Sequence, residues 1–554
     1  MIKTKRLFKK WLLKKCLQKK TDTKQEGDKQ MRKVLVTVWV LLLSVALVAC
    51  GSQETGNVEQ AGGESASEQK QEGGTLVIAV LSDATHLDPH LGADIPSANV
   101  YHGKIFETLV VQDEHMEIQP GLATEWERID DLTWEFKLRE GVQFHDGTEF
   151  TAEAVKANIE RILDEELGSP RANLFEMITE VEVVDDYTVR LVTAYPFTPL
   201  LANLAHYSGG IISPQAIEAE KNGGTPISQH PVGTGPLKFE AWEPGQEIVL
   251  SKFEHHWGEG VKVDEVVFKV VPEDATRVSM VETGEAHIAE PVEASNIDRI
   301  EASPNMKLYR SEGLGIDYIG FNLNKKPFDD VRVRQAINWA VDTEAIIDHV
   351  YNGVGMKAEG PMGPRVWGYH PDLKGYGYDP EKAKQLLAEA GYADGFQTTI
   401  WTNDNPERMN VAEVVQSQLK EVGIEADIEV MEWGAYLEHT AAGKHDMFIL
   451  GWSNMTGDAD YNQYYLFHSA AHGSAGNRTF YTNERVDELI ELGRQETDPE
   501  QRLAYYHEAQ EIEVEEAPMI FLRHTEYIAA LGKDVEGFWL HPSRIMMLND
   551  VTIP

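Results

Sequence analysis

The sequence predicts an α/β fold with an additional, smaller α+β segment. Residues 395–452 alternate apolar strands and helices in the order β-α-β-α-β, which requires a parallel sheet with right-handed crossovers. Residues 116–230 instead contain alternating strands and a hairpin, as in an antiparallel sheet. The chain has 554 residues, of which 42% are apolar and 25% charged. That composition allows several hydrophobic cores and excludes a disordered, fibrous or polytopic membrane protein.

The chain begins with a segment typical of protein export. Residues 31–33 (Met-Arg-Lys) precede a mostly apolar run at 34–48. As a helix this run would rise about 22 Å, short of the roughly 30 Å bilayer core, and therefore indicates a signal peptide. The sequence Leu-Val-Ala-Cys-Gly at 47–51 resembles a bacterial lipobox, which predicts cleavage before Cys50 and a lipid on that residue. The alternative is an ordinary signal peptide with an incidental cysteine.

Residues 1–30 precede what is already a complete signal peptide. Either the start codon is over-extended, in which case Cys16 is absent from the product, or the basic region is unusually long. Cleavage before Cys50 leaves no second cysteine in the mature chain, so no intramolecular disulfide is available. Residues 51–74 are rich in Gly, Ser, Glu and Gln, which predicts a flexible tether between the lipid and a folded body.

The charge is distributed unevenly along the chain. Residues 1–49 contain 13 Lys and Arg and 3 Asp and Glu, which leaves 37 basic and 88 acidic residues in 50–554, a net charge of −51. A surface this acidic repels phosphate backbones, so we expect no nucleic-acid binding. The acidity either serves solubility or reflects adaptation to alkaline or salty surroundings.

The first elements of the body are strands. Thr75–Leu81 is a continuous apolar run, as expected for a buried strand, and Trp134–Leu138 alternates apolar and polar residues. Val181–Thr193 reads as a hairpin that turns at Asp185 and Asp186. These patterns predict that residues 116–230 form a lobe with antiparallel strands.

The parallel unit follows a helix that Asp379 caps, with Pro380 at its first position. Within the unit, Gly423 is expected to end the first helix. The predicted elements are strand Thr398–Thr402, helix Val411–Glu421, strand Ile424–Val430, helix Gly434–Ala442 and strand Met447–Leu450.

Ligands of open α/β sheets bind in the crevice beyond the carboxyl ends of parallel strands. Three such ends are predicted, after Leu81, Ile400 and Leu450. The residues that follow combine carboxylates, an arginine and aromatic rings, which suit a zwitterionic molecule such as a short peptide. The candidate ligand-binding residues are Asp83, His86, Asn322, Trp401, Thr402, Asn403, Arg408, Trp452, Asn454, Asp458, Asp460 and Tyr461.

Each residue type suggests a role in that crevice. Arg408 can pair bidentately with a carboxylate. An amine can be held by Asp83, Asp458 or Asp460, and the aromatic residues offer flat apolar walls. The alternatives are that each carboxylate caps a helix or turn and that each tryptophan packs in a core.

Motifs for common catalytic chemistry are missing from the sequence. It contains no G-x-x-x-x-G-K-[ST] phosphate loop, no G-x-S-x-G elbow and no H-E-x-x-H zinc motif. The adjacent pair His255 and His256 would not share a face of a strand or helix and is a poor metal site. We therefore expect no enzymatic activity, cofactor or metal.

Several long motifs resemble family 5 of the extracellular solute-binding proteins of ABC importers, the peptide/nickel group. GLATEWERIDDLTWEFKLREGVQFHDGTEFTAEAVKANIERIL at 121–163 is the most specific. The others are PVGTGPLKF at 231–239, YIGFNLNKKPFDDVRVRQAINWAVD at 318–342, YDPEKAKQLLAEAGY at 378–392 and HDMFILGW…GDADYNQYYLFHS at 445–469. With the lipobox, these matches span the whole mature body.

The resemblance implies a two-lobed periplasmic-binding-protein clamshell (type II) with an additional small α+β domain, and two crossings between the lobes as the hinge. The domains implied are 1–49, basic extension and signal peptide; 50–74, lipid-anchored tether; 75–115, 231–312 and 521–554, lobe I; 116–230, the extra domain; and 313–520, lobe II.

The resemblance also implies the function and partners. The protein would capture short peptides and deliver them to ABC permease subunits with separate ATPase subunits, acting as a monomer anchored by lipid on the extracytoplasmic face of the cell membrane. Dipeptide binders of the family hold the peptide amine with an aspartate after the Gly-Trp motif, and Met455 stands at that position here. The segments after it are most similar to glutathione-binding members. Glutathione has two carboxylates, so Arg408 and, more weakly, Arg365 are candidate contacts.

Other functions remain open at this stage. Within the family, the ligand could be a nickel chelate, haem or another small solute. A contact-dependent peptide sensor would share the whole fold. A secreted hydrolase is disfavoured, because no nucleophile–base motif or metal-ligand spacing supports it.

Overall fold

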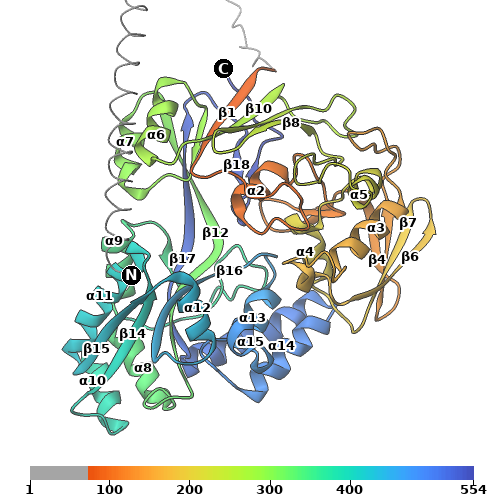
Figure 1. Ribbon diagram of the computed structural model, residues 1–554. Helices are drawn as coiled ribbons and strands as arrows, with labels where there is room; N and C mark the ends of the chain where they lie inside the picture. Colours follow the sequence, from red (N-terminus) through yellow and green to blue (C-terminus); the bar gives the residue numbers. More distant parts are fainter. Residues whose placement is uncertain (1–72) are drawn as a thin grey trace, which may run out of the picture. The chain divides into compact units, whose positions relative to one another are not determined.

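A computed structural model describes residues 73–554, and a mixed sheet of 11 strands runs through it (Figure 1). The strand order is β15-β14-β16-β12-β17-β11-β1-β10-β9-β8, and β13 pairs with β17. The bounds are β1 Thr75–Val80, β8 Leu237–Glu243, β9 Glu247–Lys252, β10 Glu265–Val270, β11 Ile288–Glu290, β12 Met306–Phe321, β13 Met356–Lys357, β14 Phe396–Asn403, β15 Ile424–Met431, β16 Met447–Ser453 and β17 Met519–Gly532.

The large sheet contains two groups of parallel strands. In one group β1 lies between β10 and β11, and in the other β14 lies between β15 and β16. We call the part around β1 and β8–β11 the first half and the part around β14–β16 the second half. Each half therefore has its own carboxyl edge, where parallel strands end.

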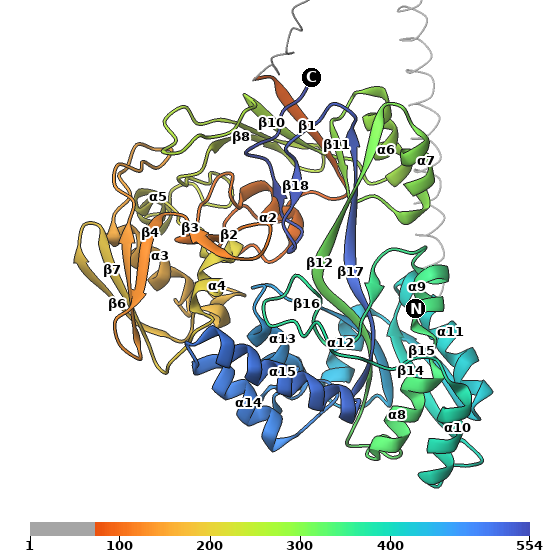
Figure 2. The same ribbon diagram turned by 180° about the vertical axis from the view of Figure 1, so that it is seen from behind.

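Two long antiparallel strands join the halves. The strands β12, with 16 residues, and β17, with 14, lie side by side between the two parallel groups (Figures 1 and 2). Their register shifts between Glu312 and Ile316, next to the predicted lobe boundary at 312. A break in a long ladder is a place where two strands can bend, so this position suits a hinge.

A second, four-stranded antiparallel sheet lies apart from the first. Its order is β4-β5-β7-β6, and β2–β3 and β18–β19 form two further two-stranded sheets. The bounds are β2 Val110–Gln112, β3 Ile118–Pro120, β4 Ala123–Arg128, β5 Thr133–Leu138, β6 Ile178–Asp185, β7 Thr188–Thr193, β18 Trp539–Leu540 and β19 Met546–Met547.

Helices cover both sheets. In the second half, α11 packs on β14 and β15, and α12 packs on β14. The bounds are α2 Ile95–Tyr101, α3 Ala152–Ile162, α4 Leu200–Ala205, α5 Pro214–Lys221, α6 Asp274–Thr283, α7 Ile297–Ala302, α8 Val331–Ala340, α9 Thr343–Val350, α10 Pro380–Glu389, α11 Pro406–Glu421, α12 Trp433–Ala441, α13 Ala459–Phe467, α14 Glu484–Gln495 and α15 Pro499–Glu516.

The predicted elements are confirmed with small shifts. The β-α-β-α-β unit is β14-α11-β15-α12-β16, with both strand pairs parallel. Its first helix begins at Pro406, five residues earlier than predicted, because the Asn405 side chain accepts the backbone N–H of Arg408 and caps it. Gly423 has φ +87°, as expected where a helix ends. The hairpin at 181–193 and its antiparallel sheet are also confirmed.

Separate cores support the different regions. One surrounds β1, β8–β10 and α2, a second fills the small sheet with α3 and α4, and a third lies between the second-half strands and α8, α10 and α11. The lobe boundaries stay a prediction. Cys50, the signal peptide and the tether lie outside the described residues, and no helix within 73–554 is both long and apolar enough to cross a bilayer.

Seven largely buried histidines predict that the fold weakens in acid. Burial holds their pKa values well below the usual 6.5. Because the unfolded chain takes up these protons and the native state does not, the free energy of unfolding should fall as pH drops from about 6.5 towards 4. Each histidine that stays neutral contributes about 1.4 kcal/mol per pH unit. The residues are His90, His102, His145, His206, His445, His524 and His541.

Thermal melts at pH 7.5, 6.5, 5.5 and 4.5 at constant ionic strength check this expectation. Burial raises the pKa of Asp460 and Glu513, so these two groups oppose the histidines, but they are outnumbered. The melting temperature should fall steadily below pH 6.5. A melting temperature that holds constant down to pH 4.5 would contradict the assignment of neutral native histidines.

Candidate functional site

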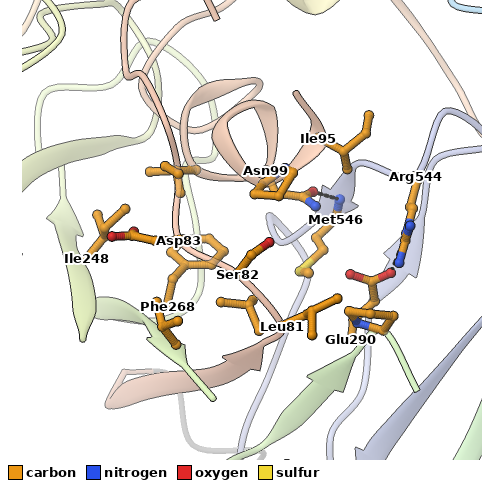
Figure 3. Close-up of a pocket in the computed structure, with 16 residues that line it drawn as sticks. Leu81, Ser82, Asp83, Ile95, Asn99, Ile248, Phe268, Glu290, Arg544 and Met546 are labelled. Atoms are coloured by element: carbon orange, nitrogen blue, oxygen red, sulfur yellow. Dashed lines mark hydrogen bonds and ion pairs between the residues drawn. The ribbon is translucent and has the colours of Figure 1, made fainter. Parts of the chain in front are cut away.

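The first-half carboxyl edge borders a cavity of about 150 Å³. The last residues of the three parallel strands, Val80, Val270 and Glu290, all line it. Apolar side chains from α2, β9 and β10 form most of the wall, and polar groups lie at opposite sides (Figure 3). This is the position at which α/β sheets bind ligands.

Two charged groups of this cavity already have partners. Glu290, 3% exposed, accepts a hydrogen bond of 2.7 Å from Nε of Arg544, and Figure 3 shows that guanidinium turned towards it. Across the cavity, Asp83 accepts hydrogen bonds from Nε1 of Trp242 at 3.0 Å and the backbone N–H of Gly245 at 2.7 Å. Asp83 therefore ties the loop after β1 to the β8–β9 turn, in place of the predicted ligand amine.

The second-half carboxyl edge presents an arginine with no carboxylate partner. Arg408 Nη1 donates to Oδ1 of Asn403 at 3.1 Å, and its guanidinium lies 5.5 Å from the ring centroid of Trp433. Within the described part of the chain, no carboxylate lies within ion-pair distance of Arg408. Arg408 and Asn403 are both predicted from the sequence as ligand-binding residues, and the structure brings them together at the end of β14.

Gly451, on β16, has no side chain, and this leaves room for the carboxylate of Asp317 beside the guanidinium of Arg408. A Cβ atom on Gly451 would lie 2.7 Å from Oδ1 of Asp317 and 3.5 Å from Nη2 of Arg408, so only glycine fits between them. Asp317 in turn accepts a hydrogen bond of 2.8 Å from Nε of Arg523. Burial raises the pKa of Tyr351, and these two arginines and two carboxylates, Asp317 and Glu407, also act on it. Arg408 is the arginine of this group that has no ion-pair partner in the described residues.

An aromatic cluster follows the end of β16. The ring of Tyr461 lies 5.5 Å from that of Trp452 and 5.0 Å from that of Tyr465, measured between ring centroids. The Tyr461 hydroxyl donates a hydrogen bond to Sδ of Met455 at 3.3 Å. Nδ2 of Asn173 donates to the Tyr465 hydroxyl at 3.2 Å. This cluster packs against the core of the small sheet and brings the second half into contact with it.

Arg171 also lacks a carboxylate partner in the described residues, as several other arginines do, and sequence reasoning missed it. Its Nη2 donates to the backbone oxygen of Ala93 at 2.9 Å and to the Tyr207 hydroxyl at 3.3 Å, and its Nε is buried with no partner. Its charge opposes the effect of burial on the pKa of Tyr461, which places it near the aromatic cluster. It lies outside any regular helix or strand pattern, so no sequence signal distinguishes it.

Asp458 and Asp460 have protein partners in place of the predicted amine. Both oxygens of Asp458, which is 6% exposed, accept hydrogen bonds from Arg502, at 2.7 and 2.8 Å. Asp460 forms an ion pair with Arg494 at 2.9 Å. Burial, only partly offset by Arg494, raises the pKa of Asp460 to about 6. The two aspartates hold α13 to α14 and α15, and Met455 itself supplies no carboxylate.

Of five further predicted residues, four are buried and His86 is half-buried, and the Thr402 hydroxyl has no hydrogen-bond partner in the described residues. Asn322 and Asn454 donate to backbone oxygens, Trp401 donates to Oγ1 of Thr399, and Nδ1 of His86 accepts the backbone N–H of Asp88. Thr402 is fully buried. Trp401, Thr402 and Asn454 thus lie buried at the carboxyl ends of β14 and β16, where Arg408, Asn403, Trp452 and Tyr461 also lie.

The contacts around Arg408 and the aromatic cluster after β16 are close enough to reach one small ligand. Gly451, beside Arg408, and Met455, beside the aromatic cluster, are four residues apart, so their Cα atoms are at most about 14 Å apart. That span matches a tri- or tetrapeptide. In residues 73–554 no group of three or more His, Cys, Asp or Glu side chains is arranged to hold a metal ion.

Comparisons with known proteins show which family model, relatives and solved structures this chain resembles. The model of the bacterial extracellular solute-binding proteins, family 5, matches residues 117–474. The glutathione-binding protein GsiB of Salmonella typhi is 35% identical over 487 residues, which cover 86% of this chain and 94% of that protein. GsiB of Escherichia coli O157:H7 is 34% identical over the same length, with the same coverage of each chain.

Solved structures confirm the predicted fold class. HbpA2 from Haemophilus parasuis is 30% identical with a TM-score of 0.82, and 87% of this chain and all of that chain are covered. DppA from Helicobacter pylori in complex with the peptide STSA is 34% identical with a TM-score of 0.73, covering 88% and 100%. AppA from Bacillus subtilis in complex with a nonapeptide is 30% identical with a TM-score of 0.68, covering 86% and 98%.

Proposed function

The chain belongs to the bacterial extracellular solute-binding proteins of family 5, and we propose that it captures a glutathione-like tripeptide for an ABC importer. One observation carries the choice of ligand: Arg171 and Arg408 both lack a carboxylate partner among the described residues. Arg171 lies near Tyr461 of the aromatic cluster, and Arg408 lies in the first turn of α11, just after β14 of the second half. Glutathione has two carboxylates and one amine, so it suits a site with two free cations. The relatives named as glutathione-binding support this choice.

Capture would work by closure of the two halves. A ligand that contacts both halves binds the closed arrangement more tightly than the open one and shifts the population towards it. The strands β12 and β17 are the connection that would bend, at the register shift after Glu312. No step in this mechanism makes or breaks a covalent bond, so the protein would act as a binding protein and not as an enzyme.

The rest of the proposal concerns the cell surface. Family membership places the protein outside the cytoplasm. Cys50 would carry the lipid that anchors it, residues 51–74 would give it reach, and a monomer would deliver ligand to the permease subunits. Mass spectrometry of the mature amino terminus would show a diacylated cysteine, whereas an unmodified cleavage site would refute the anchor.

Isothermal titration of the body from about residue 75 tests the ligand. The protein is first unfolded and refolded to strip carried ligand, and then titrated with glutathione, a dipeptide mixture and longer α-peptides. We expect glutathione to bind at about micromolar Kd, near −8 kcal/mol. Its diethyl ester, which lacks both carboxylates, should bind much more weakly.

The controls separate the alternatives. Heat from longer α-peptides alone would make the protein an oligopeptide binder and remove the role of the two arginines. Equal affinity for glutathione and its diester would contradict the charge argument. The absence of heat with every peptide would refute the peptide ligand as a class.

A further inference from the structure

A cavity of about 300 Å³ lies where Met455, just beyond β16, meets the first half. We call it the histidine cavity, because His102, His206 and His541 line it. The remaining wall is largely apolar and includes the rings of Tyr207, Trp257 and Trp539. A space of this size can enclose a whole amino-acid side chain, and the residues that the proposed ligand contacts do not fill it.

The hydrogen bonds of His206 fix which of its nitrogens carries the proton. The backbone N–H of Ser208 donates to Nδ1 at 3.2 Å, so Nδ1 is an acceptor and Nε2 holds the hydrogen. Burial, assisted by the charge of Arg171, holds the pKa of His206 well below its usual value, so the ring is neutral. Its Nε2 is buried without a partner in the described residues, and a buried donor without an acceptor is costly.

His541 repeats the same arrangement. The backbone N–H of Ser543 donates to Nδ1 at 3.2 Å, and burial lowers the pKa of the ring to about 4. Its proton therefore also lies on Nε2. Two neutral imidazoles from distant parts of the chain thus line one cavity, each with its proton on Nε2, and a ligand group that hydrogen-bonds to them must offer an acceptor.

Charge in the histidine cavity disfavours acidic groups. No lysine or arginine lines it. Glu107 accepts hydrogen bonds from His256, Trp257 and Thr234, and Asp113 accepts the backbone N–H groups of His115 and Glu117. A carboxylate that entered would therefore meet two carboxylates and no cation among the lining residues, since Arg171 donates to the Tyr207 hydroxyl from outside the lining, and the loss of its hydration would be poorly compensated.

We propose that the histidine cavity is a specificity subsite for one uncharged aromatic side chain with a hydrogen-bond acceptor, such as tyrosine, on the bound peptide. The rings of Tyr207, Trp257 and Trp539 supply the flat apolar contact. The Nε2–H groups of His206 and His541 supply the polar one. This subsite rests on the proposed function, because it selects among peptides that the two arginines hold.

Titration with γ-Glu-Xaa-Gly tripeptides tests the subsite on the glutathione framework, and Ala-Xaa-Ala tripeptides test it on α-peptides. Xaa is Tyr, Phe, Leu or Glu in each series. In the series that binds, we expect Tyr to bind more tightly than Phe and Leu, and at least tenfold more tightly than Glu. Peptides that bind with equal affinity whatever Xaa is would overturn the subsite and leave the proposed function standing. No binding by either series or by glutathione would overturn both.

Variants then assign the effect to the imidazoles. In His206→Asn the amide oxygen still accepts the Ser208 N–H, but the Nε2 donor is removed, so the preference for Tyr over Phe should disappear while Phe binding persists. His541→Asn gives an independent second measurement. Val111→Phe, which fills the cavity from β2, should weaken Tyr and Phe peptides alike.

His370→Asn is the matched control. Nδ1 of His370 accepts the backbone N–H of Asp372 in the same local arrangement, but the residue lies outside the cavity. It should leave every affinity unchanged, and thermal melts of all variants would confirm that they fold. A Tyr preference that survives both His206→Asn and His541→Asn would overturn the proposal.

Discussion

Replacing Arg161 by methionine is expected to lower the free energy of unfolding by about 3–5 kcal/mol. The substitution removes the cation that neutralises a fully buried carboxylate, and methionine fills a similar space without charge. The measurement is chemical denaturation at pH 7, with the transition midpoint and slope compared between the variant and the unmodified protein.

The geometry around Arg161 explains the size of the effect. Arg161 donates from Nη2 to Asp88 at 2.6 Å and to Glu220 at 2.8 Å, and it is 6% exposed, while Asp88 is fully buried. Burial alone would raise the pKa of Asp88, but hydrogen bonds and charge from Arg161, with a contribution from His90, hold it below its usual value. Without Arg161, Asp88 must either stay charged without a partner or bind a proton.

A matched control separates burial from charge. Arg332 pairs with Asp330 at 2.6 Å, but its side chain is 46% exposed, so Arg332→Met should change the stability by less than about 1 kcal/mol. The double variant Arg161→Met with Asp88→Asn should recover part of the lost stability, because the buried charge is then absent. If Arg161→Met and Arg332→Met lower the free energy of unfolding by the same amount, the buried Arg161–Asp88 pair does not stabilise the fold as proposed.

The fold could be predicted where local pattern decides the structure. The unit β14-α11-β15-α12-β16 follows from strand and helix periodicities that flanking residues such as Asn405 and Gly423 reinforce. The start of α11 was missed because Asn405 and Pro406 precede the apolar stripe that marked the helix. The lobe crossings were implied only by the family resemblance, since the glycines at 313 and 315 interrupt any simple strand pattern in β12.

The site was less predictable, because its chemistry depends on pairs that are far apart in the sequence. Asp458 has the residue type and position of an amine anchor, but Arg502, 44 residues later, takes both of its oxygens. Asp83 is similarly engaged by Trp242 and Gly245. Arg408 was identified because it closely follows a parallel strand, whereas Arg171 lies in an irregular segment. A carboxylate's partner, which decides whether it can serve a ligand, is a property of the tertiary structure.

Arg408→Ala is expected to weaken glutathione binding by about 30- to 150-fold, which corresponds to about 2–3 kcal/mol for a charge-assisted hydrogen bond. The fold should not change, because within residues 73–554 this guanidinium forms one side-chain hydrogen bond, to Asn403, and lies over the ring of Trp433, with no ion pair. The cap of α11 uses the backbone N–H of residue 408 and survives the substitution. Calorimetric titration of the variant and the unmodified protein measures the change.

Three comparisons show whether the loss reflects carboxylate recognition at Arg408. Arg408→Lys keeps the charge but not the bidentate geometry, so its affinity for glutathione should lie between those of the unmodified protein and Arg408→Ala. Glutathione amidated at its glycine carboxylate should bind Arg408→Ala and the unmodified protein with similar affinity if that carboxylate is the one held. Arg485→Ala removes an exposed cation on α14 and should have no effect at physiological ionic strength, because screening is strong beyond about 8 Å. If Arg408→Ala instead binds glutathione like the unmodified protein, the anionic end of the ligand lies elsewhere, and Arg171 is the cation to replace next.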